Sequence, residues 1–142
     1  MTARRHRDES GSVAVEAAVI APALIALLLL VVFAGRVSHA GAEIRRAASE
    51  AARAASLEYL PDAAATAAQE AVEANLASTT VTCAELSTAV DTTALAPGGQ
   101  VSVTVRCVAD MSDLALIGVP GQRTFVATSI EVVDRYRATG AP

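Results

Sequence analysis

The residues best suited to chemistry stand at the N-terminal edge of an apolar segment. Glu16 directly precedes this segment, and Gly11 and Ser12 stand a few positions earlier. If the chain were cut after Gly11, the new α-ammonium group of Ser12 would lie one helical turn from the Glu16 carboxylate. Opposite charges at this spacing can neutralise each other, or pair with those of a neighbouring subunit, which eases burial of the helix in a bundle. The simpler alternative is a carboxylate at a helix N-terminus that reaches water at the lipid headgroups.

Other reactive groups are sparse. Cys83 and Cys107 are the only two cysteines, and in an exported domain they are expected to form a disulfide that closes a loop of about 25 residues, worth about 3 kcal/mol. The two histidines, His6 and His39, lie far from them, and the chain has no CxxC or HxxxH spacing, so we predict no metal and no cofactor. Phosphate-loop, GxSxG and HExxH motifs are absent, which predicts a non-enzymatic protein without a small-molecule substrate.

The composition separates a membrane segment from the rest of the chain. Of the 142 residues 53% are hydrophobic but only 3% are aromatic, and the net charge is −4, which disfavours ordinary nucleic-acid binding. Residues 17–35 contain no charged residue and would form a helix of about 28 Å, close to the bilayer's hydrocarbon thickness of about 30 Å. A chain this short has no core that could bury a helix apolar on all sides. The sequence therefore predicts one membrane span, and the bilayer is its first partner.

The flanks of the span predict its orientation. Residues 1–11 form a polar, basic leader, and the positive-inside rule places this N-terminus in the cytoplasm. Arginines also follow the span, which weakens the asymmetry. An alternative is signal-peptidase cleavage after Ala40, in the small-x-small sequence Ser38-His39-Ala40, but residues 17–35 are longer than an ordinary signal-peptide core. The prediction is a single-pass cell-membrane protein whose C-terminal domain is extracytoplasmic.

The helical pattern continues beyond the span. Alanine, arginine and glutamate dominate residues 36–60, and apolar positions recur at helical spacing, so one transmembrane and stalk helix is predicted over 12–60. The apolar face of its outer half is nearly all alanine. It could pack against helices of other subunits, since small side chains allow close approach, or on the chain's own distal domain. Pro61 ends this helix, and Asp62 is expected to cap a second, alanine-rich helix that ends near Ala77.

The remaining residues have strand patterns. Residues 100–107 alternate strictly between apolar and polar side chains, which predicts a half-buried strand. Weaker strands are predicted over 79–83 and 87–93, and a final strand over 124–136 with Val126, Ile130 and Val132 facing inward. Three or four antiparallel strands beside the helices give an α+β fold, in which residues 61–142 form the extracytoplasmic domain.

Five features together carry a resemblance to a known family. They are Gly11, Glu16, Pro22 within the apolar run, the Gly35-Arg36 pair that closes it, and the Ala/Arg/Glu helix that follows. Over residues 11–53 the chain resembles the N-terminal segment of TadE-like proteins, the pseudopilin-like minor components of the tight-adherence (Flp-type) pilus assembly system.

The resemblance implies a role in assembling such a pilus or a related secretion machine. It implies that a prepilin peptidase cuts between Gly11 and Ser12, that Glu16 serves processing or assembly, and that partners are other pilin-like or Tad assembly proteins. Pro22 is then a pilin-like helix kink, or simply one of the prolines that membrane helices tolerate. The family usually has an aromatic residue after the glutamate, where this chain has Ala17. That departure leaves open a protein that keeps its leader, and a membrane-anchored binding or scaffold module that does not polymerise is the alternative function.

Overall fold

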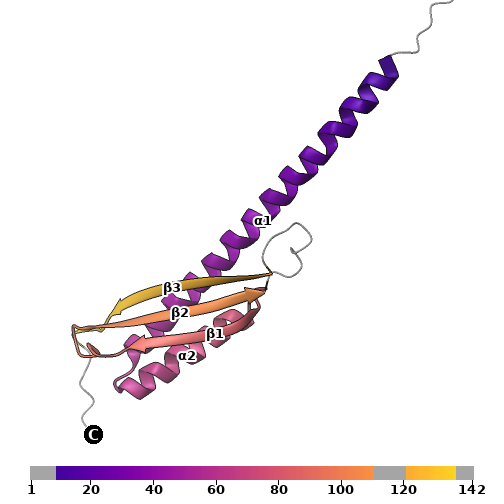
Figure 1. The fold of residues 1–142 in the computed structure, drawn as a ribbon. Coiled ribbons are helices and arrows are strands. Elements are labelled where there is room, and N and C mark those ends of the chain that lie inside the picture. The colour runs from indigo at the N-terminus through magenta and orange to yellow at the C-terminus, as the bar shows by residue number, and fades with distance from the viewer. Residues whose placement is uncertain (1–8, 111–120, 137–142) are drawn as a thin grey trace, which may run out of the picture. The chain divides into compact units, whose positions relative to one another are not determined.

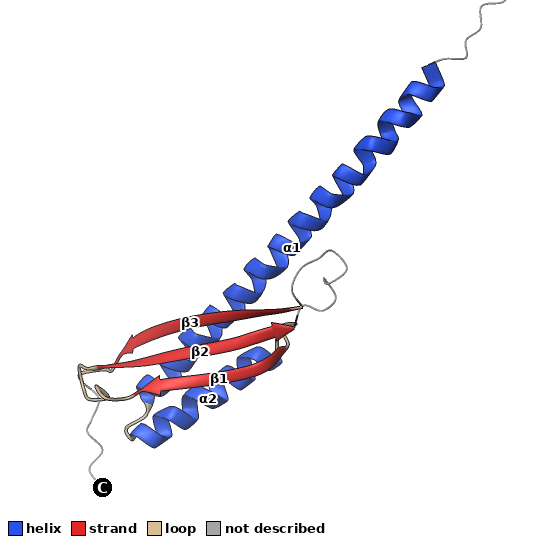
Figure 2. Ribbon diagram, viewed as in Figure 1, coloured by secondary structure: helices blue, strands red, loops and turns tan. Residues whose placement is uncertain are grey.

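The computed structural model describes residues 9–110 and 121–136 and confirms the α+β class. Along the chain the elements are α1 (Glu9–Leu57), α2 (Pro61–Ala77), β1 (Cys83–Asp91), β2 (Gln100–Asp110) and β3 (Gln122–Val132), as Figures 1 and 2 show. The chain divides into two compact units, residues 1–37 and residues 38–142. The long helix begins and ends slightly earlier than the predicted range 12–60, and it continues through Pro22.

The second helix begins differently from the prediction. Its N-cap is Leu60, in extended conformation with φ −106° and ψ 139°, and no side chain caps the helix by a hydrogen bond. Asp62 was expected to be the cap, but it lies in the first turn. The reason is Pro61, whose fixed φ and missing N–H suit the first helical position, so the helix begins one residue before Asp62. The Asp62 carboxylate still lies where the helix dipole favours negative charge.

Three antiparallel strands form one sheet in the order β1-β2-β3. The two weak strands predicted over 79–83 and 87–93 are one strand, β1, with a bulge between Cys83 and Glu85. The strand predicted over 100–107 is confirmed within β2, and its alternate side chains from Val101 onward are buried. A glycine turn precedes β2: Gly98 has φ +79°, and a β-carbon at Gly99 would collide with backbone carbonyls of the same turn.

The inward face predicted for the last strand is wrong. Val126, Ile130 and Val132 are 61%, 56% and 71% exposed, whereas Ala127 is buried and Phe125 packs against the core. The register with β2 explains the difference, because residues opposite each other in a sheet share one face. Ala127 pairs with the buried Val105, so the alternate residues of β3, which include the larger aliphatic ones, lie on the opposite face.

Both helices pack on one face of the sheet, and alanine makes up most of the core there. Ile44 is the largest buried side chain of α1, and the other fully buried positions of that helix are alanines. The second helix contributes one row at every fourth position. The sequence left open whether the alanine face of α1 packs against other subunits or on the chain's own distal domain. Beyond residue 40 it packs on the distal domain. The buried helical residues are Ala40, Ile44, Ala47, Ala48, Ala51, Ala52, Ala55, Ala64, Ala68, Val72 and Leu76.

Candidate membrane anchor and assembly segment

The first unit presents its apolar side chains to the outside on every side of the helix. Within the described ranges, one helix is long and apolar enough to cross a membrane. An 18-residue stretch within Ala14–Leu57 has a mean hydropathy of 2.9, and none of its residues is buried. Exposing this much aliphatic surface to water would be costly, so it requires lipid or another apolar partner. The exposed large residues of this unit are Val15, Val19, Ile20, Leu24, Ile25, Leu27, Leu28, Leu29, Leu30, Val31 and Val32.

Glu16 is the one carboxylate among these exposed side chains. It lies on α1 with Val15 beside it and with Val19 and Ile20 one turn further along, so no arginine is within a helical turn of it on its own helix. The predicted processing site, Gly11 and Ser12, lies within the helical range of α1, and Pro22 lies in its interior. The kink at Pro22 and the roles of these residues stay predictions.

The two cysteines form the predicted disulfide. Their Cα atoms are 5.4 Å apart and their sulfur atoms 1.99 Å apart, and the bond joins Cys83 at the start of β1 to Cys107 in the middle strand. It crosses the β1 bulge, because Cys83 pairs with Ala109 while Cys107 pairs with Leu86. Cys107 is fully buried among the core residues, so the bond ties the outer strand to the core.

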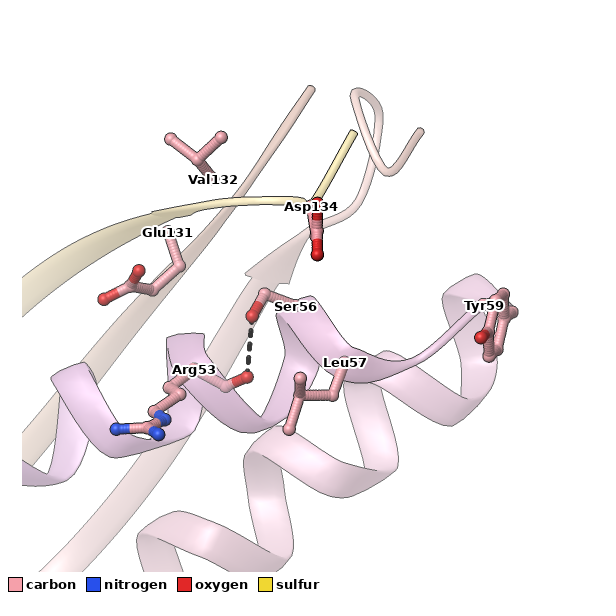
Figure 3. Close-up of a pocket in the computed structure, with 7 residues that line it drawn as sticks. All are labelled: Arg53, Ser56, Leu57, Tyr59, Glu131, Val132 and Asp134. Carbon is pink, nitrogen blue, oxygen red and sulfur yellow. Dashed lines mark hydrogen bonds between the residues drawn. The ribbon is translucent and has the colours of Figure 1, made fainter. Parts of the chain in front are cut away.

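One open hollow lies where α1 ends, with a volume of about 520 Å³. Figure 3 shows its lining, which comes from the end of α1, the α1–α2 connection and the end of β3. The Ser56 hydroxyl donates to the Arg53 carbonyl, and the two oxygens are 2.8 Å apart. No local sequence pattern predicts this hollow, because the three segments that line it are far apart along the chain. The described residues contain no group of His, Cys, Asp and Glu that could hold a metal ion. The lining residues are Arg53, Ser56, Leu57, Tyr59, Glu131, Val132 and Asp134.

The exposed apolar helix and the disulfide-bonded α+β unit fit a protein anchored to a membrane by one N-terminal helix. Residues 11–53 match the family described as TadE-like protein, which confirms the resemblance seen in the sequence. That segment is therefore TadE-like, and it fits a membrane protein associated with the Tad pilus. The match ends at Arg53 within α1 and leaves the second helix and the sheet outside it. No curated protein and no solved structure matches the chain.

Proposed function

We propose that this protein is a non-enzymatic minor pilin or pseudopilin that contributes to assembly of a tight-adherence pilus or a related secretion machine. The observation that carries the proposal is the TadE-like segment 11–53, whose apolar helix is exposed on all sides. Such a helix is suited to lie in the bilayer and to leave it for a bundle of similar helices.

Glu16 makes the move of this helix from the bilayer into a bundle specific. On its own helix it has no cation within one turn, so inside an apolar bundle it requires a partner from elsewhere. Cleavage after Gly11 by a prepilin peptidase creates that partner, either as the Ser12 α-ammonium of the same chain or as that of a neighbouring subunit. Processing and assembly are then coupled, because only the cleaved chain carries the matching charge.

The disulfide supports the proposed topology. Disulfides persist in oxidising compartments and are rare in the cytosol, where thiols are kept reduced. The bond between Cys83 and Cys107 therefore favours an extracytoplasmic position for residues 38–142. A domain outside the membrane can also be exposed at the cell surface. With the sheet outside, the single apolar helix leaves the N-terminus in the cytoplasm, where a prepilin peptidase would meet its substrate.

The test of processing is mass spectrometry of the N-terminus of the protein extracted from membranes. We expect a start at Ser12, and a Gly11→Ala variant that retains the leader. A start at Met1 or Thr2 would leave a plain membrane anchor, and a start at Gly41 would indicate ordinary secretion and overturn the proposal.

The test of assembly compares Glu16→Ala with Glu50→Ala, the same substitution at an exposed position of α1 in the second unit. We expect Glu16→Ala to abolish co-purification with other Tad proteins and pilus formation while the protein remains in the membrane. Glu50→Ala should retain both. If Glu16→Ala and Gly11→Ala leave processing, pilus formation and co-purification unchanged, the protein is better described as a scaffold module that does not polymerise.

A further inference from the structure

The outward side of α1 in the second unit is basic. Buried residues such as Ile44, Ala48 and Ala55 fix the side that faces the core. On the opposite side, four exposed residues follow one another at helical spacing: Ala42, Arg46, Ser49 and Arg53. We call these four residues the basic row. Two glutamates, Glu43 and Glu50, flank it on one side and Arg45 flanks it on the other.

Within the described part of the chain, neither Arg46 nor Arg53 is in an ion pair. The basic row therefore keeps both of its charges available to another molecule.

The outward side of α2 is acidic. Its exposed charged residues are Asp62, Glu70 and Glu73, and the helix contains no basic residue. Five exposed residues lie on the side of α2 away from its buried row. Four of them follow one another at helical spacing, namely Asp62, Thr66, Gln69 and Glu73, and Glu70 lies beside them. We call these five residues the acidic row. Two hydrogen bonds are formed by side chains of this row: the Thr66 hydroxyl donates to the Asp62 carbonyl at 2.9 Å, and Gln69 Nε2 donates to the Glu73 carboxylate at 3.5 Å.

The two helices lie toward opposite edges of the sheet. α2 contacts β1, whereas Gly41 of α1 lies beside Phe125 of β3, whose ring is within 4 Å of a β-carbon built on that glycine. Figure 1 shows α2 running along β1. Because β1 and β3 are the two edges of the sheet, the two helices, and with them the two rows of charges, lie toward opposite edges.

The opposite charges also lie at matching levels. After α1 ends, the chain turns back into α2 (Figure 1), so positions along both helices can be measured from this hairpin turn at 1.5 Å per residue. Arg53 then lies about 6 Å from the end of α1 and Asp62 about 2 Å from the start of α2. Arg46 lies about 16 Å from the turn, between Glu70 at about 14 Å and Glu73 at about 18 Å. A neighbouring copy moved sideways, without a shift along the helix, brings these charges together.

We infer that the basic row of one copy binds the acidic row of the next copy of this chain. The inference rests on the proposed function, because chains anchored in one bilayer must share one direction, and this contact keeps the 38–57 segments of neighbouring copies parallel. The contact joins two different surfaces, so it leaves one row unoccupied at each end and adds further copies in a ring or an open filament. Ala42 and Ser49 allow the helices to approach closely.

Electrostatic pairs on an exposed surface are individually weak and are screened by salt. Confinement to a membrane compensates, since it raises the effective concentration of neighbouring copies. The contact is therefore expected to form in the membrane and to weaken in solution at high ionic strength.

The test is cross-linking of the full chain in native membranes. Ser49 and Gln69 both lie about 12 Å from the hairpin turn, so a thiol-specific cross-linker with a short spacer should join Ser49→Cys of one copy to Gln69→Cys of the next. We expect a ladder of dimers, trimers and larger species from the double variant and no product from either single variant. Co-expression of the two single variants should give dimers only.

Charge reversal provides the sharper arm. Arg46→Glu with Arg53→Glu should reduce the ladder at least tenfold, as should Glu70→Arg with Glu73→Arg, and combining the four substitutions should restore it. Arg106→Glu is the matched control, because Arg106 is exposed on the other face of the sheet and should leave the ladder unchanged. Retention of the native disulfide in each variant shows that the domain has folded.

The outcomes separate this inference from the proposed function. Cross-linking of Ser49→Cys to itself would show a symmetric contact and overturn the inference, as would a product that contains another protein in place of a second copy. No ladder in a protein that still co-purifies with Tad proteins and is cleaved after Gly11 overturns the self-association alone. Loss of cleavage and of co-purification would overturn the proposed function itself.

Discussion

Reduction of the disulfide should destabilise the sheet by an amount that follows from the loop it closes. Cys83 and Cys107 are 24 positions apart, and the chain-entropy relation for a loop of this length gives about 3.5 kcal/mol at 25 °C. This is a large fraction of the stability of about 5–15 kcal/mol that is usual for a domain. The core offers little compensation, because most of its helical positions are alanines that bury small areas.

The assay is hydrogen exchange of the β2 amides in the full chain, in detergent micelles, with and without a reducing agent. β2 is the central strand, so its amides exchange mainly when the whole sheet opens. A loss of about 3.5 kcal/mol corresponds to about 300-fold faster exchange, since each 1.4 kcal/mol is tenfold. The Cys83→Ala/Cys107→Ala variant should lose about 1 kcal/mol more, because removing the buried sulfur of Cys107 leaves a small cavity.

Two controls make the reasoning refutable. Addition of the reducing agent to the double-alanine variant should change nothing, which excludes effects of the reagent itself. Amides of the first unit, residues 9–37, should exchange at the same rate in all samples. If reduction accelerates exchange of the β2 amides by less than tenfold, the alanine core holds the sheet without the bond and the argument from loop entropy is wrong.

Three further predictions follow from local geometry. The pKa of Asp91 is lowered from 3.8 because the backbone N–H and then the hydroxyl of Thr93 donate to its carboxylate, so its contribution to stability is present above that value and is lost as the pH falls through the folded pKa. Thr93→Ala should raise the pKa measured by NMR only part of the way, since the backbone bond remains. Gly99→Ala should lower the melting temperature of the sheet, whereas Gly35→Ala, whose β-carbon meets nothing within 4 Å, should not. Ala51→Leu should cost about 1–3 kcal/mol in chemical denaturation, because it overpacks a fully buried site between the helices and the sheet.

The helices and the central strand could be predicted because each has a strong local signal. The charge-free run 17–35, the proline that separates the two helices and the strict alternation over 100–107 all depend on neighbouring residues alone. The inner face of β3 could not be predicted in this way. Valine and isoleucine at positions 126, 130 and 132 favour burial, but Ala127 is fixed on the inner face by its pairing with Val105, which is distant in the sequence.

The candidate site, too, could be predicted from the sequence only in part. Gly11, Glu16 and the apolar run were found from spacing, because their proposed chemistry acts along one helix. The basic and acidic rows required the structure: the sequence shows alternating charges on α1, and only the burial of residues such as Ile44 and Ala48 establishes which arginines face outward. The segment Ile117-Gly118-Val119-Pro120-Gly121 also predicts a loop, but it lies mostly outside the described residues.

The change in side-chain size along α1 follows from what covers each part of the helix. Up to Val32 the large aliphatic side chains are exposed in all directions, which is stable only where lipid or a neighbouring apolar helix covers them. From Ala40 to Ala55 the positions facing the sheet are buried and nearly all alanine, so the sheet and the second helix can approach the helix backbone closely. The family match from 11 to 53 spans both parts. The matched segment thus includes both the helix surface that we propose enters a bundle and most of the face on which the sheet is built. We therefore expect a substitution of a buried alanine beyond residue 40 to affect the proposed assembly through the domain that this alanine supports.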